Sequence, residues 1–168
     1  MNRLKKQYFL PLFLLLFAAC TRQVEDPAVA QAKIRQIQTR SFIGCQSKAV
    51  MKEMVALLQD QGYSVKNVNS EIGILTAERN IDVERFSSKF FAVLFSGSKA
   101  RWKKHSLVEL TSNLSDQEGR TQVRITFLVR VFDNLGRVVE VKQVLEEEHY
   151  AAFFAELQKG LLLSSQKL

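Results

Sequence analysis

Apolar and polar residues alternate most regularly between residues 121 and 132, in the segment TQVRITFLVRVF. This period of two predicts a strand with one apolar face and one polar face. The apolar face consists of Val123, Ile125, Phe127, Val129 and Val131. The opposite face carries Arg124 and Arg130, which either face solvent or receive an acidic partner or a phosphate group. Such a strand is typical of an antiparallel sheet that has one face in the core and the other in water.

Shorter segments that contain β-branched and aromatic residues predict more strands. These segments are residues 39–44, 63–68, 73–79, 106–112 and 137–145. Turn-forming residues between positions 69 and 73 favour a hairpin of the second and third segments. The segments LSDQEG and DNLG favour turns that join the last three strands into an antiparallel meander.

Apolar residues recur at intervals of three and four in two other segments, which predicts two helices. The first helix begins at Ser47, a residue suited to cap it, and ends before Gly62. Its apolar face either packs against the sheet or, because it contains methionine, lines a ligand pocket. That face consists of Val50, Met51, Met54, Val55, Leu57 and Leu58.

The second predicted helix, residues 149–163, has one apolar face that we expect to pack against the sheet. That face consists of Tyr150, Phe153, Phe154, Leu157 and Leu161. Three glutamates at positions 146–148 suit the positive end of the helix dipole better than they suit a metal site. The order of elements predicts an α+β domain. We expect an antiparallel sheet of about five to six strands, with two or three helices mainly on one face.

One segment departs from this pattern, because residues 86–95 contain a cluster of phenylalanines that is followed by basic residues. We interpret residues 81–100 as an insert between the early hairpin and the later meander. The insert is either a third helix that covers the sheet or an amphipathic docking element that enters a membrane interface or a groove of a partner. The candidate docking residues are Phe86, Phe90, Phe91, Leu94, Phe95 and Trp102.

The chain begins with a positively charged stretch and an apolar run, and two alanines then precede Cys20. This order is typical of a secretory signal peptide, so we expect residues 1–19 to be removed. The apolar run is interrupted by Pro11 and is shorter than the roughly twenty residues that a transmembrane helix needs. The mature chain is then expected to consist of a tether, residues 20–38, and a single domain, residues 39–168.

The stretch LFAAC resembles the lipobox that signal peptidase II recognises in bacterial lipoproteins, although Phe17 stands where that motif usually has leucine, valine or isoleucine. The resemblance implies that Cys20 is diacylated and anchors the mature chain without a membrane span. Two or three acyl chains hold a protein at a bilayer essentially permanently. Thr21 stands where lipoproteins retained in the inner membrane often have aspartate. The resemblance therefore favours the outer membrane, with the protein facing the periplasm.

The tether and the net charge give little sign of further partners. Residues 28–37 form either a short helix or a linker, and a linker is expected because the apolar positions are too few to predict a helix that packs. The formal charge of +7 falls to +4 without the first nineteen residues, since 21 basic and 17 acidic residues remain. Because these charges form no long run of one sign, we expect no nucleic-acid partner.

The residue types that usually carry catalysis are few and badly spaced. His105 and His149 are the only histidines, and neither lies in a zinc-binding spacing. The sequence has no glycine-rich phosphate loop and no Gly-x-Ser-x-Gly motif. Cys45 is the one thiol left for the mature domain, and it is either a half-buried packing residue or a reactive residue near a helix start. We expect no catalytic residues, no cofactor and no metal ion.

The segments LLQDQGY, GILTAER and YAAFFAEL are similar to segments of small bacterial outer-membrane lipoproteins, a resemblance that implies no activity and no site. We expect a non-enzymatic lipoprotein that binds an envelope protein and acts in the assembly of an envelope complex, for example a secretion or outer-membrane machine. The alternative is a periplasmic lipoprotein that binds a lipid or another small apolar ligand beneath the phenylalanine-rich insert. The sequence leaves the identity of the partner and the oligomeric state open.

Overall fold

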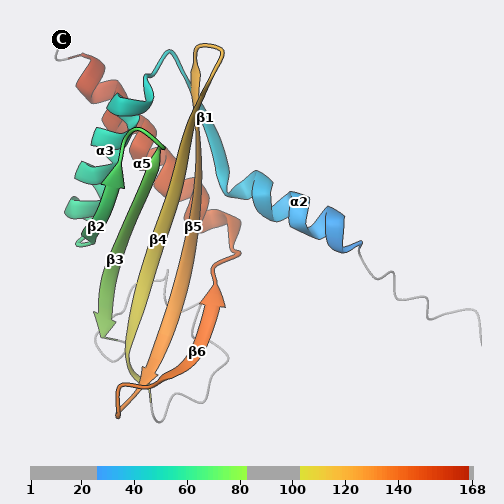
Figure 1. Ribbon diagram of the computed structural model, residues 1–168, viewed down its shortest axis with the longest axis vertical. Helices are drawn as coiled ribbons and strands as arrows, with labels where there is room; N and C mark the ends of the chain where they lie inside the picture. Colours follow the sequence, from blue (N-terminus) through green and yellow to red (C-terminus); the bar gives the residue numbers. More distant parts are fainter. Residues whose placement is uncertain (1–25, 83–102, 167–168) are drawn as a thin grey trace, which may run out of the picture. The chain divides into compact units, whose positions relative to one another are not determined.

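A computed structural model describes residues 26–82 and 103–166 of the chain. The chain divides into two compact units, and the second unit begins at Ala32, within helix α2 (Pro27–Ile37). The later elements, which are labelled in Figure 1, all belong to this second unit. They are β1 (Thr39–Ile43), α3 (Ser47–Asp60), β2 (Ser64–Asn69), β3 (Ile74–Asp82), β4 (Lys103–Gln117), β5 (Arg120–Asp133), β6 (Val138–Gln143) and α5 (Glu147–Ser165).

The strands of the described residues form one six-stranded antiparallel sheet in the order β1-β5-β4-β3-β2, and β6 also pairs with β5. β1 lies along Arg120–Arg124, and β6 lies along Leu128–Phe132. The two short strands therefore share one side of the longer strand β5. A single antiparallel sheet with helices on one face confirms the predicted α+β class.

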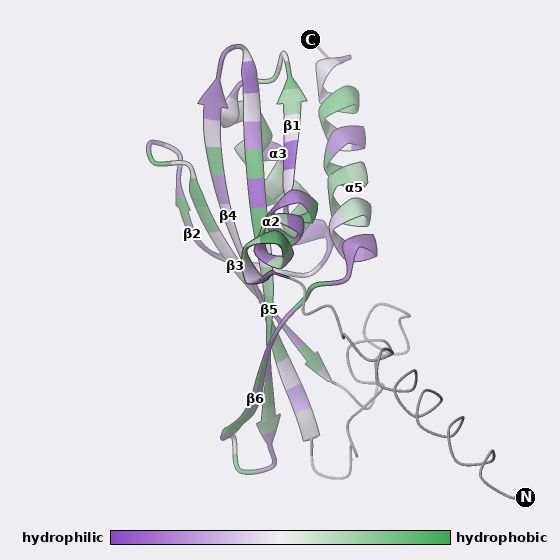
Figure 2. Cartoon of the chain, turned by 90° about the vertical axis from the view of Figure 1, so that its right-hand side faces the viewer, coloured by the Kyte–Doolittle hydropathy of each residue, from purple (hydrophilic) through white to green (hydrophobic). Residues whose placement is uncertain are grey.

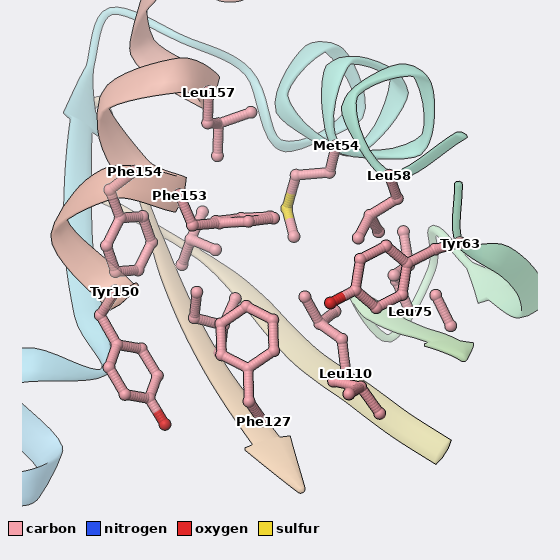
Figure 3. Packing of buried hydrophobic residues seen from close by; sticks show 14 of the residues in the cluster. Met54, Leu58, Tyr63, Leu75, Leu110, Phe127, Tyr150, Phe153, Phe154 and Leu157 are labelled. Carbon is pink, nitrogen blue, oxygen red and sulfur yellow. The ribbon is translucent and has the colours of Figure 1, made fainter. Parts of the chain in front are cut away.

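Helices α3 and α5 cover one face of the sheet, and the core lies between the two layers (Figures 1 and 2). Every second residue of β5 is buried, which confirms the face predicted from the alternation of its sequence. The ring of Phe127 on this face lies 5.8 Å from the ring of Phe153 and 5.5 Å from that of Tyr150, measured between centroids. Figure 3 shows Met54 of α3 pointing into the same core. The methionines of α3 therefore pack against the sheet and α5.

Helix α3 follows the predicted period, because Val50, Met51, Met54 and Leu58 are buried. The predicted cap at Ser47 is wrong, since Gln46 occupies the cap position and makes no side-chain cap hydrogen bond. The Ser47 hydroxyl instead donates to a carboxylate oxygen of Asp116 on β4, at 2.8 Å. Gly62 ends the helix as predicted, with a φ of +78° that favours glycine.

Helix α5 confirms the predicted packing helix, because all five residues of its expected apolar face are buried. Glu146 is its N-cap, and Glu147 and Glu148 lie in its first turn, where negative charge suits the helix dipole. Phe154 packs between Phe153, at 6.1 Å, and Phe42 of β1, at 6.4 Å, measured between ring centroids. The aromatic residues of α5 thus bind the helix both to the middle of the sheet and to its edge.

A buried polar junction joins β1, β6 and α5 at the middle of β5. The N–H of Ile125 donates to the carbonyl of Gln38 at 2.9 Å, and the N–H of Val144 donates to the carbonyl of Phe127 at 3.0 Å. The Tyr150 hydroxyl donates to the carbonyl of Val144 at 2.7 Å and accepts from the side-chain amide of Gln38 at 3.5 Å. Since both side chains are fully buried, these bonds replace the water that folding removes.

The turn between β4 and β5 is shorter than predicted. The segment LSDQEG was expected to be a turn as a whole, but its first four residues continue β4. Only Glu118 and Gly119 form the turn, and their φ angles of 43° and 79° are those of a two-residue hairpin loop. Backbone pairing between β4 and β5 continues through these residues. Their polar side chains, taken by themselves, indicate a loop.

The predicted linker also differs from the structure, because Pro27–Ile37 is the helix α2. Pro27 stands at the first helical position, where its missing N–H is not needed, and a carboxylate oxygen of Asp26 accepts from the N–H of Ala28 at 2.9 Å. These start signals explain the helix. None of its residues is buried, which agrees with the small number of apolar positions.

The two arginines on the polar face of β5 bind within the chain. Arg130 forms an ion pair with Glu109 of β4 at 3.1 Å, and Arg124 donates to the side-chain oxygen of Gln38 at 3.4 Å. Arg124 is exposed and Arg130 is partly exposed, so both side chains also face solvent, the first of the two possibilities given for them.

Candidate interaction site

A groove of about 470 Å³ lies between strand β1 and the C-terminal half of helix α5. Figure 2 shows the two elements beside each other. We call this groove, together with the outer side of β1, the edge groove. Its lining residues are Arg40, Ser41, Phe42, Ile43, Gly44, Cys45, Gln158, Leu161, Leu162 and Ser165.

The two elements place apolar side chains on the wall and at the mouth of the edge groove. Phe42 and Leu161 are buried, and they anchor β1 and α5 to the core. Their neighbours Ile43 and Leu162 point elsewhere, because side chains alternate along a strand and rotate by about 100° per residue along a helix. Ile43 is 85% exposed and Leu162 is 58% exposed. The groove therefore offers apolar surface that the folded domain leaves in contact with water.

The outer side of β1 offers backbone hydrogen-bonding groups next to this apolar surface. β1 is the end strand of the described sheet, and its ladder runs only to β5. The carbonyl of Gln38 and the N–H of Gly44 bind β5 and the turn that precedes it. Because the direction of backbone groups alternates along a strand, Thr39, Ser41 and Ile43 direct their N–H and C=O groups away from β5. An edge of this kind can take up one more strand.

Arg40 is the one charged residue among those that line the groove. Its guanidinium carbon lies 5.7 Å from the centroid of the Phe154 ring, a distance typical of a cation–π contact. The contact holds the guanidinium beside α5 at one end of the groove. A carboxylate on a bound segment would be favoured there.

The loop at the other end of the groove is held by a small hydrogen-bond network. The buried hydroxyl of Thr121 lies 2.7 Å from the carbonyl of Cys45 and 2.8 Å from a carboxylate oxygen of Asp116. The Ser47 hydroxyl donates to the second oxygen of the same carboxylate. These hydrogen bonds lower the pKa of Asp116 below its ordinary value, the bond from Thr121 most strongly. Cys45 is thereby fixed beside the groove as a half-buried free thiol.

The described residues do not form a metal-binding site. No group of three or more histidine, cysteine, aspartate and glutamate residues lies close enough to hold a metal ion in residues 26–82 and 103–166. His105 stacks on Phe132 with ring centroids 4.6 Å apart. His149 lies at the start of α5, where burial lowers its pKa below 6.5 and the nearby Glu146 and Glu148 oppose that shift. The two histidines thus lie on different elements.

No helix in the described ranges is both long enough and apolar enough to cross a bilayer.

The site residues that the sequence predicts lie outside the described ranges. Cys20 precedes the first described residue. The candidate docking residues of the insert, from Phe86 to Trp102, lie between the two described ranges. Both hypotheses therefore stay predictions.

Comparisons with known proteins give no family for this chain. No protein-family model matches it, and no curated protein matches it.

Sequence reasoning missed the edge groove, although two signals for it are present. Ile43 is apolar but stands on the opposite face of its strand from the core residue Phe42. The run Leu161–Leu163 also contains more leucine than one helix face can bury. Neither signal shows which strand lies at the end of the sheet. The exposed residues form a groove only because β1 is that end strand and lies beside α5.

Proposed function

We propose that this chain is a non-enzymatic lipoprotein of the bacterial envelope, and that it binds an extended segment of a partner protein in the edge groove. The observation that carries the proposal is the combination of a strand edge with apolar surface in one groove. Addition of a strand to a sheet edge is a common way to bind peptides: backbone hydrogen bonds provide affinity, and pockets for alternate side chains provide specificity.

The geometry defines the chemistry of the bound segment. Its backbone would pair with the outward groups of Ser41 and Ile43. Every second side chain would point toward Leu161 and Leu162 of α5 and would therefore be apolar. An acidic residue near Arg40 would complete the match. The expected partner is an extended protein segment with alternating apolar residues and one carboxylate.

The place of action is part of the proposal and rests on the resemblance of the N-terminal segment to a lipobox. Acylation at Cys20 would hold the chain at the periplasmic face of the outer membrane. Residues 21–38 would then connect the lipid to β1, the strand that borders the groove. A protein held at a membrane surface meets envelope partners at high effective concentration, which suits a role in assembly.

The core packing favours binding at the surface over a ligand cavity between α3, α5 and the sheet. Phe127, Phe153 and Leu157 fill the space between α5 and the sheet, and Met54 fills that below α3 (Figure 3). The alternative function as a binder of an apolar ligand depends on the insert, which lies outside the described residues.

Photocrosslinking in intact cells tests the proposal. The full chain carries p-benzoylphenylalanine either at Leu162, in the groove, or at Ile72, an equally exposed apolar residue in the turn between β2 and β3. We expect a discrete protein adduct from position 162 and none from position 72. A lipid that copurifies with the chain, without any protein adduct at position 162, would favour the apolar-ligand alternative.

A second variant tests whether the partner binds as a strand. Ser41→Pro removes an N–H that points away from β5, and proline is tolerated on such an edge. It should weaken the adduct at position 162 at least tenfold, whereas Ser41→Ala should leave it unchanged. An adduct that persists with proline at position 41 would show that the partner does not pair with β1.

A further inference from the structure

Strand β6 exposes apolar side chains along a second sheet edge. Val138, Val139 and Val141 are 48%, 52% and 54% exposed. β6 pairs with β5 on one side, and no other strand of the described residues pairs with it. Figure 1 shows β6 as the last arrow on its side of the sheet. Exposed apolar edges of this kind promote pairing between chains, so natural proteins cover or protect them.

The register with β5 determines which backbone groups of β6 point outward. The N–H of Val144 donates to the carbonyl of Phe127 at 3.0 Å, so this position forms a hydrogen-bonded pair. Such pairs alternate along an antiparallel ladder. Lys142 and Glu140 consequently direct their backbone groups to β5, whereas Val141 and Gln143 direct theirs away from it. Val141 thus lies at the centre of the outer edge, and its backbone N–H and C=O groups point away from β5.

The charges that flank Val141 make this edge complementary to itself. Glu140 and Lys142 lie on the same face of β6, since their side chains form an ion pair at 2.9 Å. If a second copy pairs in the antiparallel direction with Val141 opposite Val141, Glu140 faces Lys142 of the partner subunit, and Lys142 faces Glu140 of the partner subunit. Opposite charges at such positions stabilise strand pairing, whereas parallel pairing would bring like charges together.

We propose that two copies of the chain form a dimer by antiparallel pairing of their β6 strands, centred on Val141. The contact is two-fold symmetric, so it closes after two copies and does not continue into a fibre. It places the exposed Val141 of each copy at the centre of the contact and joins the two sheets into one. The register of β6 with β5 shifts at Val139, which has no partner on β5, so the regular pairing between the two copies is limited to the three residues from Glu140 to Lys142. This surface lies on β6 and does not depend on the edge groove.

Charge reversal of the full chain tests this pairing. Two copies with different affinity tags are produced together, extracted in detergent and purified through one tag, and the amount of the other tag is measured. We expect the parent copies to copurify. Glu140→Lys places two lysines opposite each other, and Lys142→Glu places two glutamates opposite each other. Each single variant should therefore lose copurification at least tenfold.

The two single variants provide the matched control, because a Glu140→Lys copy and a Lys142→Glu copy are complementary to each other. Produced together, they should copurify again, which also shows that both variants fold. Copurification that each single variant retains with itself would reflect shared detergent micelles and would overturn the proposal. Failure of the mixed pair to copurify, while the parent pair does, would overturn the antiparallel register centred on Val141.

Discussion

At the scale of single residues, Asp116 shows how polar side chains fix the end of the edge groove. Its carboxylate accepts hydrogen bonds from Ser47 of α3 and from Thr121 of β5. Three elements therefore meet at one acidic group on β4. The bonds favour the ionised form, and for that reason they lower the pKa of the carboxyl group.

The lowered pKa of Asp116 predicts a contribution to acid unfolding. A carboxyl group whose pKa is lower in the folded than in the unfolded state stabilises the protein above the unfolded pKa. That contribution is lost as the pH falls from near 4 through the folded pKa. Asp116→Asn cannot ionise, so its free energy of unfolding should fall less steeply over this range than that of the parent. Urea unfolding of the full chain in detergent, measured between neutral pH and about pH 2.5, provides the comparison.

Asp60→Asn is the matched control for this pH dependence, because it makes the same substitution at an exposed aspartate at the end of α3. It should follow the parent curve. Parent-like acid sensitivity in Asp116→Asn would contradict the role given to the Ser47 and Thr121 hydrogen bonds.

Single polar residues are also where sequence reasoning fails most clearly. Ser47 has the residue type and the position of a helix cap, but its hydroxyl donates to Asp116 on β4, a residue far away in the chain. The sequence predicts Gln38 to be part of a linker. The residue is buried, however, and its side-chain amide donates to the hydroxyl of Tyr150, which lies 112 positions later in the chain. Local patterns contain no information on such partners, because these depend on how the strands are ordered in the sheet.

At the scale of elements, periodicity predicted what lies in the core. The alternation in β5 and the helical periods of α3 and α5 each identify the buried face correctly. Burial of these faces provides the main driving force for folding, so their pattern is strongly constrained. The ends of elements are less predictable: the backbone ladder extends β4 through polar residues, and start signals outweigh weak amphipathicity in α2.

The aromatic packing of α5 predicts a large effect of one substitution. Phe154 is buried between Phe42, Phe153 and the guanidinium of Arg40. Phe154→Ala should lower the free energy of unfolding by about 3 to 5 kcal/mol, since it removes the transfer energy of the ring and leaves a cavity. Thermal and urea unfolding of the full chain in detergent measure this loss.

Leu163→Ala gives the matched control on the same helix. Leu163 is exposed, so its truncation should change the free energy of unfolding by no more than about 0.5 kcal/mol. Equal stability of Phe154→Ala and the parent would contradict the packing of α5 against the sheet edge, which forms one wall of the edge groove.

At the scale of the whole molecule, the sequence predicted one α+β sheet but not its free edges. Strand order makes β1 an end strand and places β6 beside β5, and this order follows from contacts between residues far apart in the chain. Both proposed surfaces depend on it. The sequence instead predicted functional residues where its composition is unusual, at Cys20 and in the cluster from Phe86 to Phe95. These positions lie outside the described residues.

The proposed lipid anchor of the whole molecule depends on one thiol, that of Cys20, and this gives the last prediction. If Cys20 carries the lipid, Cys20→Ser should lose both incorporation of a labelled fatty acid and association with the membrane. Each buried methylene of an acyl chain contributes about 0.8 kcal/mol, so loss of all chains removes the anchor. Cys45→Ser is the matched control: it changes the other cysteine, which lies beside the edge groove, and it should keep the label. Equal label and equal membrane association in Cys20→Ser and the parent would contradict the lipobox interpretation. The edge groove and β6 would then have to act in a protein that reaches its partners without a lipid anchor.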